Sequence, residues 1–514
     1  MRRLVALALL AACHKSPAPG ADADSLWDLA PDGTELGIVA TPHALTLASH
    51  ALDTVRQLTA MSDFQTLKPS VDQVVTGLLG KPDATLADAG LTTDRGFAMF
   101  VTKDGVLGTL PVADRDRFVA LKHGTRGSAA DTINGASCRT LEGLYVCATS
   151  EAMFARLGKA SLRGKPQLAG ARGDVELYAP GFDALGAPGD LAVIAQLAPG
   201  QVEVRGRWAG TLGGAIAPYL GLAAPKVDTA GASGFAAMNL APLLEDLPAE
   251  PIAGGITFEQ LAKALKGPIT ATCPAGTTDL QLRIALADPA PVETLLEHCD
   301  ELPLDPRPTT KDGTCHLELP AVSVGAVDVW VEGNELRVGQ HRGAAATGQP
   351  AAMTPFGREL AAGDWTAVFW GRGTMLNSAG SSAPTELDAT AAMTTHAMAL
   401  VSELGAGVKL DATGIQLRGL VRTVWANPPG LGDKLAAIPA SEAIQSGSAA
   451  KALATPGTPF AADYTAGQGG LMIPAAVVGF GAAVVVPMVV RLTAPEAAPP
   501  RSTPSAPGSA SPPP

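Results

Sequence analysis

The stretch LAPGQVEVRGRWAG, Leu197–Gly210, alternates apolar and polar side chains after its Pro-Gly pair. The apolar positions of this alternation are Val202, Val204 and Trp208. Successive side chains of a β-strand point to opposite faces of the sheet, so this spacing is typical of a half-buried antiparallel strand. The stretch VKLDATGIQLRGLVR, Val408–Arg422, has the same character, and its apolar positions are Ile415, Leu417 and Leu420.

Two further patterns recur along the chain. The first is a short strand-like run, a Pro or Gly break and a helix start, found at Leu36–Leu45, Val175–Leu185, Gly234–Leu244 and Trp365–Leu376. The second is a hairpin that leads into a helix, found at Phe97–Leu121 and Ile269–Leu295. Asp104-Gly105 is the strongest hairpin signal. Asp114 and Asp288 are placed to cap the helices that follow the hairpins.

These recurring units predict two halves of similar design, residues 25–230 and 231–440. Each half is expected to be an antiparallel sheet with helices on one face, which is an α+β architecture. The composition is that of a folded chain, because 46% of its 514 residues are hydrophobic and 17% are charged. Only 4% are aromatic, so small aliphatic side chains must supply most of the core.

The first residues have the features of an export signal. Arg2 and Arg3 precede the apolar run Leu4–Ala12, which has the length of a signal-peptide core. The motif Leu10-Ala11-Ala12-Cys13 resembles the lipobox of bacterial lipoprotein precursors. The resemblance implies that residues 1–12 are removed and that Cys13 carries the lipid, with residues 13–24 as a tether. The alternative is an ordinary secretory signal that happens to contain a cysteine.

The C-terminal part contains one long apolar run. Residues 441–468 are predicted to be a linker, and Gly469–Val490 then lacks any charged residue. A run of about 22 residues is long enough to span a bilayer, so we predict a transmembrane helix, with a buried core helix as the alternative. Arg491 follows it, which favours a cytoplasmic C-terminal side and places the bulk of the chain in the periplasm. The Pro/Ser/Ala-rich residues 491–514 are predicted to be a disordered tail.

Small residues recur at every fourth position of this apolar run, at Ala475, Gly479 and Ala483. In lipid such a stripe allows close helix packing, so we expect contact with another copy or another envelope protein. The run LMIPAAVVGFGAAVVVP also resembles the N-terminal helix of type IV pilins. Gly470 stands where pilins have a glutamate, and the run lies at the opposite end of the chain, so convergence among small-residue helices explains the resemblance.

Five cysteines follow Cys13, and an oxidising compartment favours disulfides between them. Cys138 and Cys147 flank the turn-like pair Glu142-Gly143, so a hairpin would bring them together. Of the other three we favour Cys299 with Cys315, which leaves Cys273. A bridge between Cys273 and Cys299 is the main alternative.

No residue pattern predicts a catalytic site, a metal site or a cofactor. His298-Cys299 and Cys315-His316 contain zinc-binding residue types, but neighbouring residues of a strand point apart, so a disulfide is favoured over a metal. The sequence GASGF around Ser233 lacks the context of a nucleophile elbow, and Gly371-Arg372-Gly373 lacks the rest of a phosphate loop. The run Asp114–Arg117 is most simply a helix cap followed by a solvated face.

The formal net charge of −12 argues against nucleic-acid binding, because phosphate backbones repel an acidic surface. We expect a non-enzymatic envelope protein, attached to a membrane and facing the periplasm, with a binding, scaffolding or assembly role. The alternatives are an exported hydrolase whose site is built from residues distant in sequence, and a carrier of an apolar ligand. An enzyme is the less favoured interpretation.

The lipobox yields a direct test. We expect Cys13→Ala to abolish incorporation of a clickable fatty acid into the full chain, because the acylated thiol is lost. Cys273→Ala is the matched control and should keep parental labelling. Equal labelling of Cys13→Ala and the parent would contradict the lipidation.

Overall fold

The computed structural model describes residues 22–423, apart from several internal segments of which 60–67, 340–352 and 373–400 are the longest. The predicted signal peptide, the linker 441–468, the run Gly469–Val490 and the tail 491–514 lie outside the described residues, as do Cys13, Ala475, Gly479 and Ala483. Within the described part of the chain, no helix is both long and apolar enough to span a membrane.

The first half of the chain forms nine antiparallel strands. They lie side by side in the order β4-β5-β6-β3-β2-β1-β7-β8-β9. The strands are β1 (Thr34–Ala40), β2 (Phe97–Thr102), β3 (Gly105–Leu110), β4 (Asp131–Ile133), β5 (Ala136–Leu141), β6 (Leu144–Ala148), β7 (Val175–Ala184), β8 (Ala187–Ala198) and β9 (Gln201–Gly210). The helices are α2 (Ala23–Trp27), α3 (Pro42–Thr59), α4 (Lys68–Leu79), α5 (Arg115–Leu121) and α6 (Glu151–Arg156).

The second half repeats this connectivity with one additional strand. Its order is β15-β16-β17-β18-β14-β13-β10-β19-β20-β21, again antiparallel. The strands are β10 (Ala232–Asn239), β13 (Leu265–Pro274), β14 (Gln281–Leu286), β15 (Thr309–Lys311), β16 (Thr314–Leu319), β17 (Gly325–Glu332), β18 (Glu335–Gly339), β19 (Ala367–Arg372), β20 (Val401–Asp411) and β21 (Gly414–Thr423).

Short elements complete the second half. They are the pair β11 (Pro251–Ala253) and β12 (Ile256–Thr257), the helices α7 (Phe258–Ala264), α8 (Ala290–Glu297) and α9 (Pro355–Ala362), and the 3-10 turns η2 (Gly214–Tyr219), η3 (Ala241–Leu243) and η4 (Cys299–Glu301). One of the two predicted N-caps is confirmed: Asp114 is the N-cap of α5, whereas Pro289 and not Asp288 is the N-cap of α8. The Asp114 side chain accepts a hydrogen bond from the backbone N–H of Arg117, and the Asp288 side chain accepts one from Ala290.

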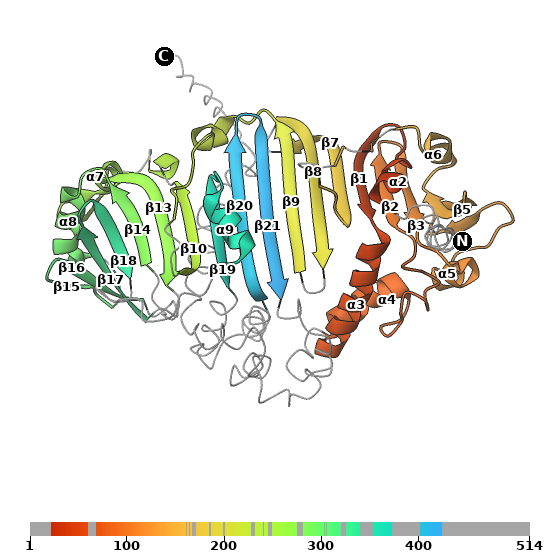
Figure 1. The fold of residues 1–514 in the computed structure, drawn as a ribbon, viewed down its shortest axis with the longest axis horizontal. Helices are drawn as coiled ribbons and strands as arrows, with labels where there is room; N and C mark the ends of the chain where they lie inside the picture. The colour runs from red at the N-terminus through yellow and green to blue at the C-terminus, as the bar shows by residue number, and fades with distance from the viewer. Residues whose placement is uncertain are drawn as a thin grey trace, which may run out of the picture.

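The two halves join where β9 pairs with β21, so a single sheet of 19 strands crosses the whole molecule (Figure 1). We call this pairing the seam. At its centre Arg205 lies opposite Arg418. Each of these arginines is followed by a glycine, so the seam is a local two-fold repeat in which Gly206 faces Leu417 and Gly419 faces Val204.

The predicted α+β fold of two similar modules, each with its own antiparallel sheet, is therefore wrong. Strands account for 47% of the described residues and helices for 23%, and 19 of the strands form one continuous sheet. The physical reason is that the last strand of each half exposes an edge of unpaired backbone groups, and the two edges satisfy each other. Leu420 also differs from the prediction. It lies on the face opposite to Ile415 and Leu417, where it is 2% exposed and packs in a core with residues of α9.

Tryptophan rings pack on glycines of the covered face of the sheet, where α2 lies over β1 and α9 lies over β19 and β20 (Figure 1). A Cβ on Gly37 would lie 2.4 Å from the ring of Trp27, and a Cβ on Gly407 would lie 2.4 Å from the ring of Trp365. Neither glycine has a positive φ, so the ring and not the backbone requires glycine there. Glycine at these positions leaves room for the tryptophan rings to pack directly on the sheet.

This packing predicts the effect of one added methyl group. We expect Gly407→Ala to lower the free energy of unfolding by about 1–3 kcal/mol, because the Trp365 ring must move. Gly213→Ala is the control, since its Cβ would meet nothing within 4 Å, and it should change stability by less than about 0.5 kcal/mol. Urea denaturation measures both variants. Equal stability of the two would contradict the packing.

Candidate functional site

The two sides of the seam differ completely in chemistry. Residues that pair across neighbouring strands share a face, so the registers of β7–β9 and β19–β21 define both sides. On one side, which we call the charged face, Arg205, Arg418 and Arg422 lie together with Glu203 and Glu403. On the other side, which we call the apolar face, every position of two successive rows carries an apolar side chain or a glycine.

On the charged face, two arginines are held directly opposite each other. Like charges in this position destabilise a strand pair unless a carboxylate lies between them. Glu203 Oε1 accepts a hydrogen bond from Arg205 Nη2 at 3.0 Å and one from Arg418 Nη2 at 3.2 Å. Arg418 also pairs with Glu359 of α9 at 2.5 Å. Both arginines therefore bind carboxylates of the same chain, and Arg418 links the seam to α9.

A buried carboxylate reinforces the same side. Glu403 is 2% exposed and accepts hydrogen bonds from Trp370 Nε1 at 2.8 Å and Arg422 Nη1 at 2.6 Å. In the first half, the fully buried Glu176 accepts from Trp27 Nε1 at 2.8 Å and from Arg172 at 3.0 Å. Each half thus uses a buried glutamate to satisfy the polar edge of a core tryptophan, as buried polar groups require.

The apolar face runs across eight strands. One row is Ile38, Leu177, Val193, Gly206, Leu417, Val408, Ala367 and Met238. The next row is Ala40, Val175, Ala195, Val204, Gly419, Ala406, Phe369 and Ala236. None of these positions carries a charged or hydrogen-bonding side chain. Such a continuous apolar surface is normally covered by something in a folded protein.

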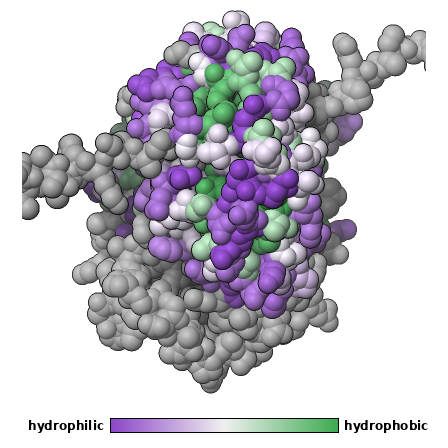
Figure 2. Space-filling model, turned by 90° about the vertical axis from the view of Figure 1, so that its right-hand side faces the viewer, coloured by the Kyte–Doolittle hydropathy of each residue, from purple (hydrophilic) through white to green (hydrophobic). Residues whose placement is uncertain are grey.

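The structure covers one end of this face and leaves the seam open at the other. Trp208 is only 3% exposed, packs with Leu212 and Leu220 beside η2, and donates a hydrogen bond from Nε1 to the Phe182 carbonyl at 3.1 Å. Toward the other end, Val202 is 40% exposed and Leu417 and Val421 are each 39% exposed. The end of the molecule formed by the first half carries hydrophilic residues around separate hydrophobic patches (Figure 2).

At two glycines of the apolar face, the described residues leave room for a larger side chain. A Cβ on Gly206 would lie 3.5 Å from the side chain of Leu417, and among the described residues a Cβ on Gly419 would have its nearest contact at 3.7 Å, with the Gly405 carbonyl oxygen. Neither residue has a positive φ. A glycine inside a strand that serves neither turn nor bulge often marks a site where another backbone or ligand approaches closely. The pair therefore forms two shallow pits at the centre of an exposed apolar surface.

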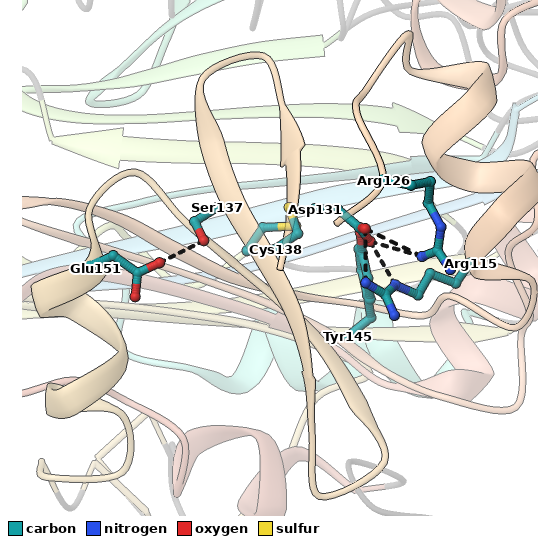
Figure 3. Close-up of a disulfide and its surroundings, with 8 residues drawn as sticks. Arg115, Arg126, Asp131, Ser137, Cys138, Tyr145 and Glu151 are labelled. Carbon is teal, nitrogen blue, oxygen red and sulfur yellow. Dashed lines mark hydrogen bonds and ion pairs between the residues drawn. A yellow bond between two sulfur atoms is a disulfide. The ribbon is translucent and has the colours of Figure 1, made fainter. Parts of the chain in front are cut away.

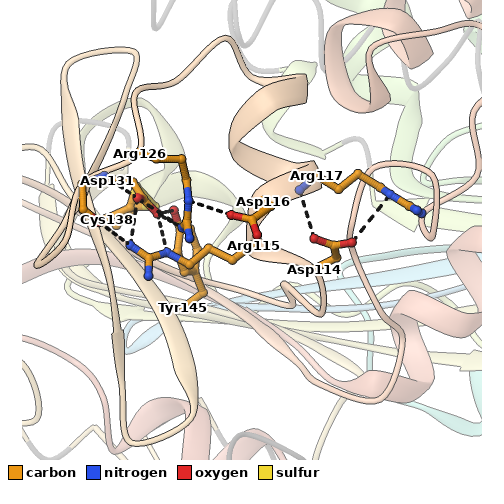
Figure 4. A network of polar contacts seen from close by, with 10 residues as sticks. Asp114, Arg115, Asp116, Arg117, Arg126, Asp131, Cys138 and Tyr145 are labelled. Atoms are coloured by element: carbon orange, nitrogen blue, oxygen red, sulfur yellow. Dashed lines mark hydrogen bonds and ion pairs between the residues drawn. A yellow bond between two sulfur atoms is a disulfide. The ribbon is translucent and has the colours of Figure 1, made fainter.

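A second polar cluster lies at the other end of the first half, beside a disulfide (Figures 3 and 4). The fully buried carboxylate of Asp131 accepts hydrogen bonds from Arg115 Nε at 2.6 Å, Tyr145 Oη at 2.8 Å and Arg126 Nη1 at 3.1 Å. Burial by itself raises the pKa of Asp131, but the hydrogen bonds from Arg115 and Tyr145 outweigh it, so the pKa lies well below its usual range.

The contacts of this cluster hold a helix and two hairpins together. Burial raises the pKa of Tyr145, and its hydrogen bond to Asp131 raises it further, so the phenol stays protonated. Arg115 comes from the start of α5, Asp131 from β4 and Tyr145 from β6, so their contacts bind one helix to the hairpins below it. The run Asp114–Arg117 acts as predicted, since Asp114 caps α5 and the exposed Asp116 pairs with Arg126 at 2.8 Å.

Both favoured disulfides are present in the structure. Cys138 lies directly opposite Cys147 in the β5–β6 hairpin, and its turn residues Glu142 and Gly143 both have positive φ, as the tight hairpin turn requires. Cys299 of η4 is joined to Cys315 of β16. Cys273 is buried in β13 and belongs to neither bridge, so the alternative pairing with Cys299 is not formed.

The described residues include histidines that pair with carboxylates at the surface. The described part of the chain contains no cluster of three or more His, Cys, Asp or Glu side chains suited to hold a metal ion. His43 contacts Asp174 at 2.8 Å and His316 contacts Asp328 at 2.9 Å. Both imidazoles are exposed at the surface, and the contacts found for them are these carboxylates rather than a nucleophile. The candidate functional site is the apolar face of the seam, where Val202, Leu417 and Val421 are exposed. The alternation in the sequence indicated the two strands of this site, but it did not indicate that their apolar side chains are exposed.

Comparison with known proteins adds no relative, because no family model, no curated protein and no solved structure matches this chain.

The Asp131 cluster predicts a pH-dependent contribution to stability. We expect Asp131→Asn to lower the free energy of unfolding by about 2 kcal/mol at pH 7, because Arg115 loses its counterion while remaining partly exposed to water. The folded-state pKa of Asp131 is lowered, so its stabilisation is present above the unfolded pKa of about 4 and is lost as the pH falls toward the folded value.

Thermal or urea unfolding between pH 7 and pH 2 measures this effect. The difference between the parent and Asp131→Asn should shrink as the pH falls below about 4. Asp116→Asn is the control, because the Asp116 side chain is 81% exposed and should contribute almost nothing. A difference that stays constant over this pH range would contradict the assignment.

Proposed function

We propose that this protein is a non-enzymatic binding protein of the bacterial cell envelope, and that the apolar face of the seam is its binding surface. The observation that carries the proposal is the exposure of Val202, Leu417 and Val421 on a face without any charged side chain. Apolar surface of this extent favours association, because removing it from water is favourable at roughly 25 cal/mol per Å².

The shape of the surface favours a macromolecular partner over a small ligand. Small-molecule sites are concave and bury most of the ligand. The apolar face is the side of an open sheet, and its eight strands at about 4.8 Å spacing extend over roughly 40 Å. A partner that covers it needs a broad apolar surface of its own. Binding is therefore favoured over the hydrolase and over the carrier of an apolar ligand.

The proposed location rests on the sequence. A lipid on Cys13, followed by the polar residues 13–24, would hold the sheet near a membrane. A flexible tether of about twelve residues has a mean reach of about 20 Å. The sheet could then meet partners in the periplasm while remaining attached, which suits a scaffolding or assembly role.

The proposal predicts that the two sides of the seam behave differently in cells. We expect a photoreactive p-benzoylphenylalanine at Leu417 of the full chain to form covalent adducts with a protein. The same residue at Arg207, which is exposed on the opposite side of the same strand pair, should form far fewer. Denaturing gels of irradiated cells show the adducts as bands above the chain. The absence of adducts from Leu417, or equal adducts from both positions, would contradict the proposal.

A further inference from the structure

We propose that the partner on the apolar face is a second copy of this chain, packed face to face so that two seams lie against each other. This inference rests on the proposed function and names the occupant of the same surface. Two antiparallel sheets commonly pack in this way at about 10 Å separation, with the side chains of their inner faces interdigitated.

The relief of the apolar face is complementary to itself. Around the Arg205–Arg418 pair, Gly206 lies opposite Leu417, and Gly419 lies opposite Val204 in the next row. Pits and projections therefore alternate about the local two-fold axis of the seam. A two-fold dimer requires one patch to fit a copy of itself, and this patch presents equal numbers of pits and projections. The exposed Leu417 of each copy would fill a glycine pit of the other.

The fold already uses this kind of packing on the other side of the sheet, the side of the charged face, which α2 and α9 cover. There Gly37 receives the ring of Trp27, and Gly407 receives the ring of Trp365. On the apolar face Gly206 and Gly419 provide the same kind of depression, yet the nearest atoms to a Cβ there lie at 3.5 Å and 3.7 Å, which is ordinary contact. A side chain of the second copy would complete the pattern.

The area suits a stable dimer. Rows of side chains on one face of a strand are separated by two residues, or about 6.8 Å, and eight strands span roughly 40 Å. A third row crosses six of these strands and is also apolar, and its positions are Leu197, Val202, Val421, Leu404, Gly371 and Gly234. The three rows cover roughly 700 Å² of sheet, which is close to the roughly 800 Å² that each partner contributes to a standard specific interface. The charge distribution also permits a face-to-face contact, because the arginines and glutamates of the seam lie on the charged face and not on the apolar face. Two copies of a chain of net charge −12 can therefore meet without bringing like charges into contact.

The test uses photo-crosslinking of the full chain in cells. With p-benzoylphenylalanine at Val202, we expect an adduct at twice the chain mass of 52.0 kDa, and two differently tagged copies should both be present in that band. Adding Leu417→Lys should reduce the band at least tenfold, because it places a charge in the apolar contact. Gln416→Lys is the matched control and should leave the band unchanged, since Gln416 is exposed on the other side of the same strand.

A second variant separates loss of contact from loss of fold. Gly419→Leu fills one pit without adding charge, and it should also reduce the band at twice the chain mass while circular dichroism of the isolated chain stays unchanged. Adducts of Val202 that contain only a different protein would overturn the second copy as partner and leave the proposed binding function intact. The absence of any adduct would overturn both. A band at twice the chain mass that resists Leu417→Lys and Gly419→Leu would overturn the face-to-face contact.

Discussion

The pairing of β9 with β21 is the constraint on which the rest of the structure depends. Each half of the chain ends in a long strand with one free edge, and an unpaired edge invites association with any other strand. The two edges satisfy each other in an unbroken register from Gly414–Ala209 to Arg422–Gln201. The result is one sheet of 19 strands in place of two domains, and it places the apolar sides of both halves in a common plane.

The seam also explains why its two faces have different roles. Arg205 and Arg418 meet at the local two-fold axis because the same Arg-Gly sequence occurs in both strands. Their repulsion is relieved by Glu203 between them and by Glu359 of α9. With the charged groups engaged on one side, the alternation of the strands leaves only apolar side chains and glycines on the other. A face of paired charges and an apolar face with exposed side chains are thus two consequences of one pairing.

The ends of the sheet are stabilised by other means. Small aliphatic side chains bury little area each, and the outer hairpins of the first half are short. The Cys138–Cys147 bridge and the buried Asp131 with its arginines and Tyr145 hold these hairpins against α5. In the second half, Cys299–Cys315 joins η4 to β16 at the corresponding edge. Covalent and ionic contacts therefore compensate for a thin core where the sheet ends.

The sequence by itself determined the local features of this protein. Hydrophobic alternation located β9 and β21, aspartates marked the caps of α5 and the region before α8, and a Glu-Gly turn brought Cys138 to Cys147. Each depends on residues close in the chain, whose geometry the backbone restricts strongly. Only the tertiary structure decided that Arg205 lies opposite Arg418, that Asp131 is buried among Arg115 and Tyr145, and that Leu420 points away from Leu417. Alternation shows which residues share a face, but what covers that face depends on segments some 200 residues away, and their pairing is a property of the whole sheet.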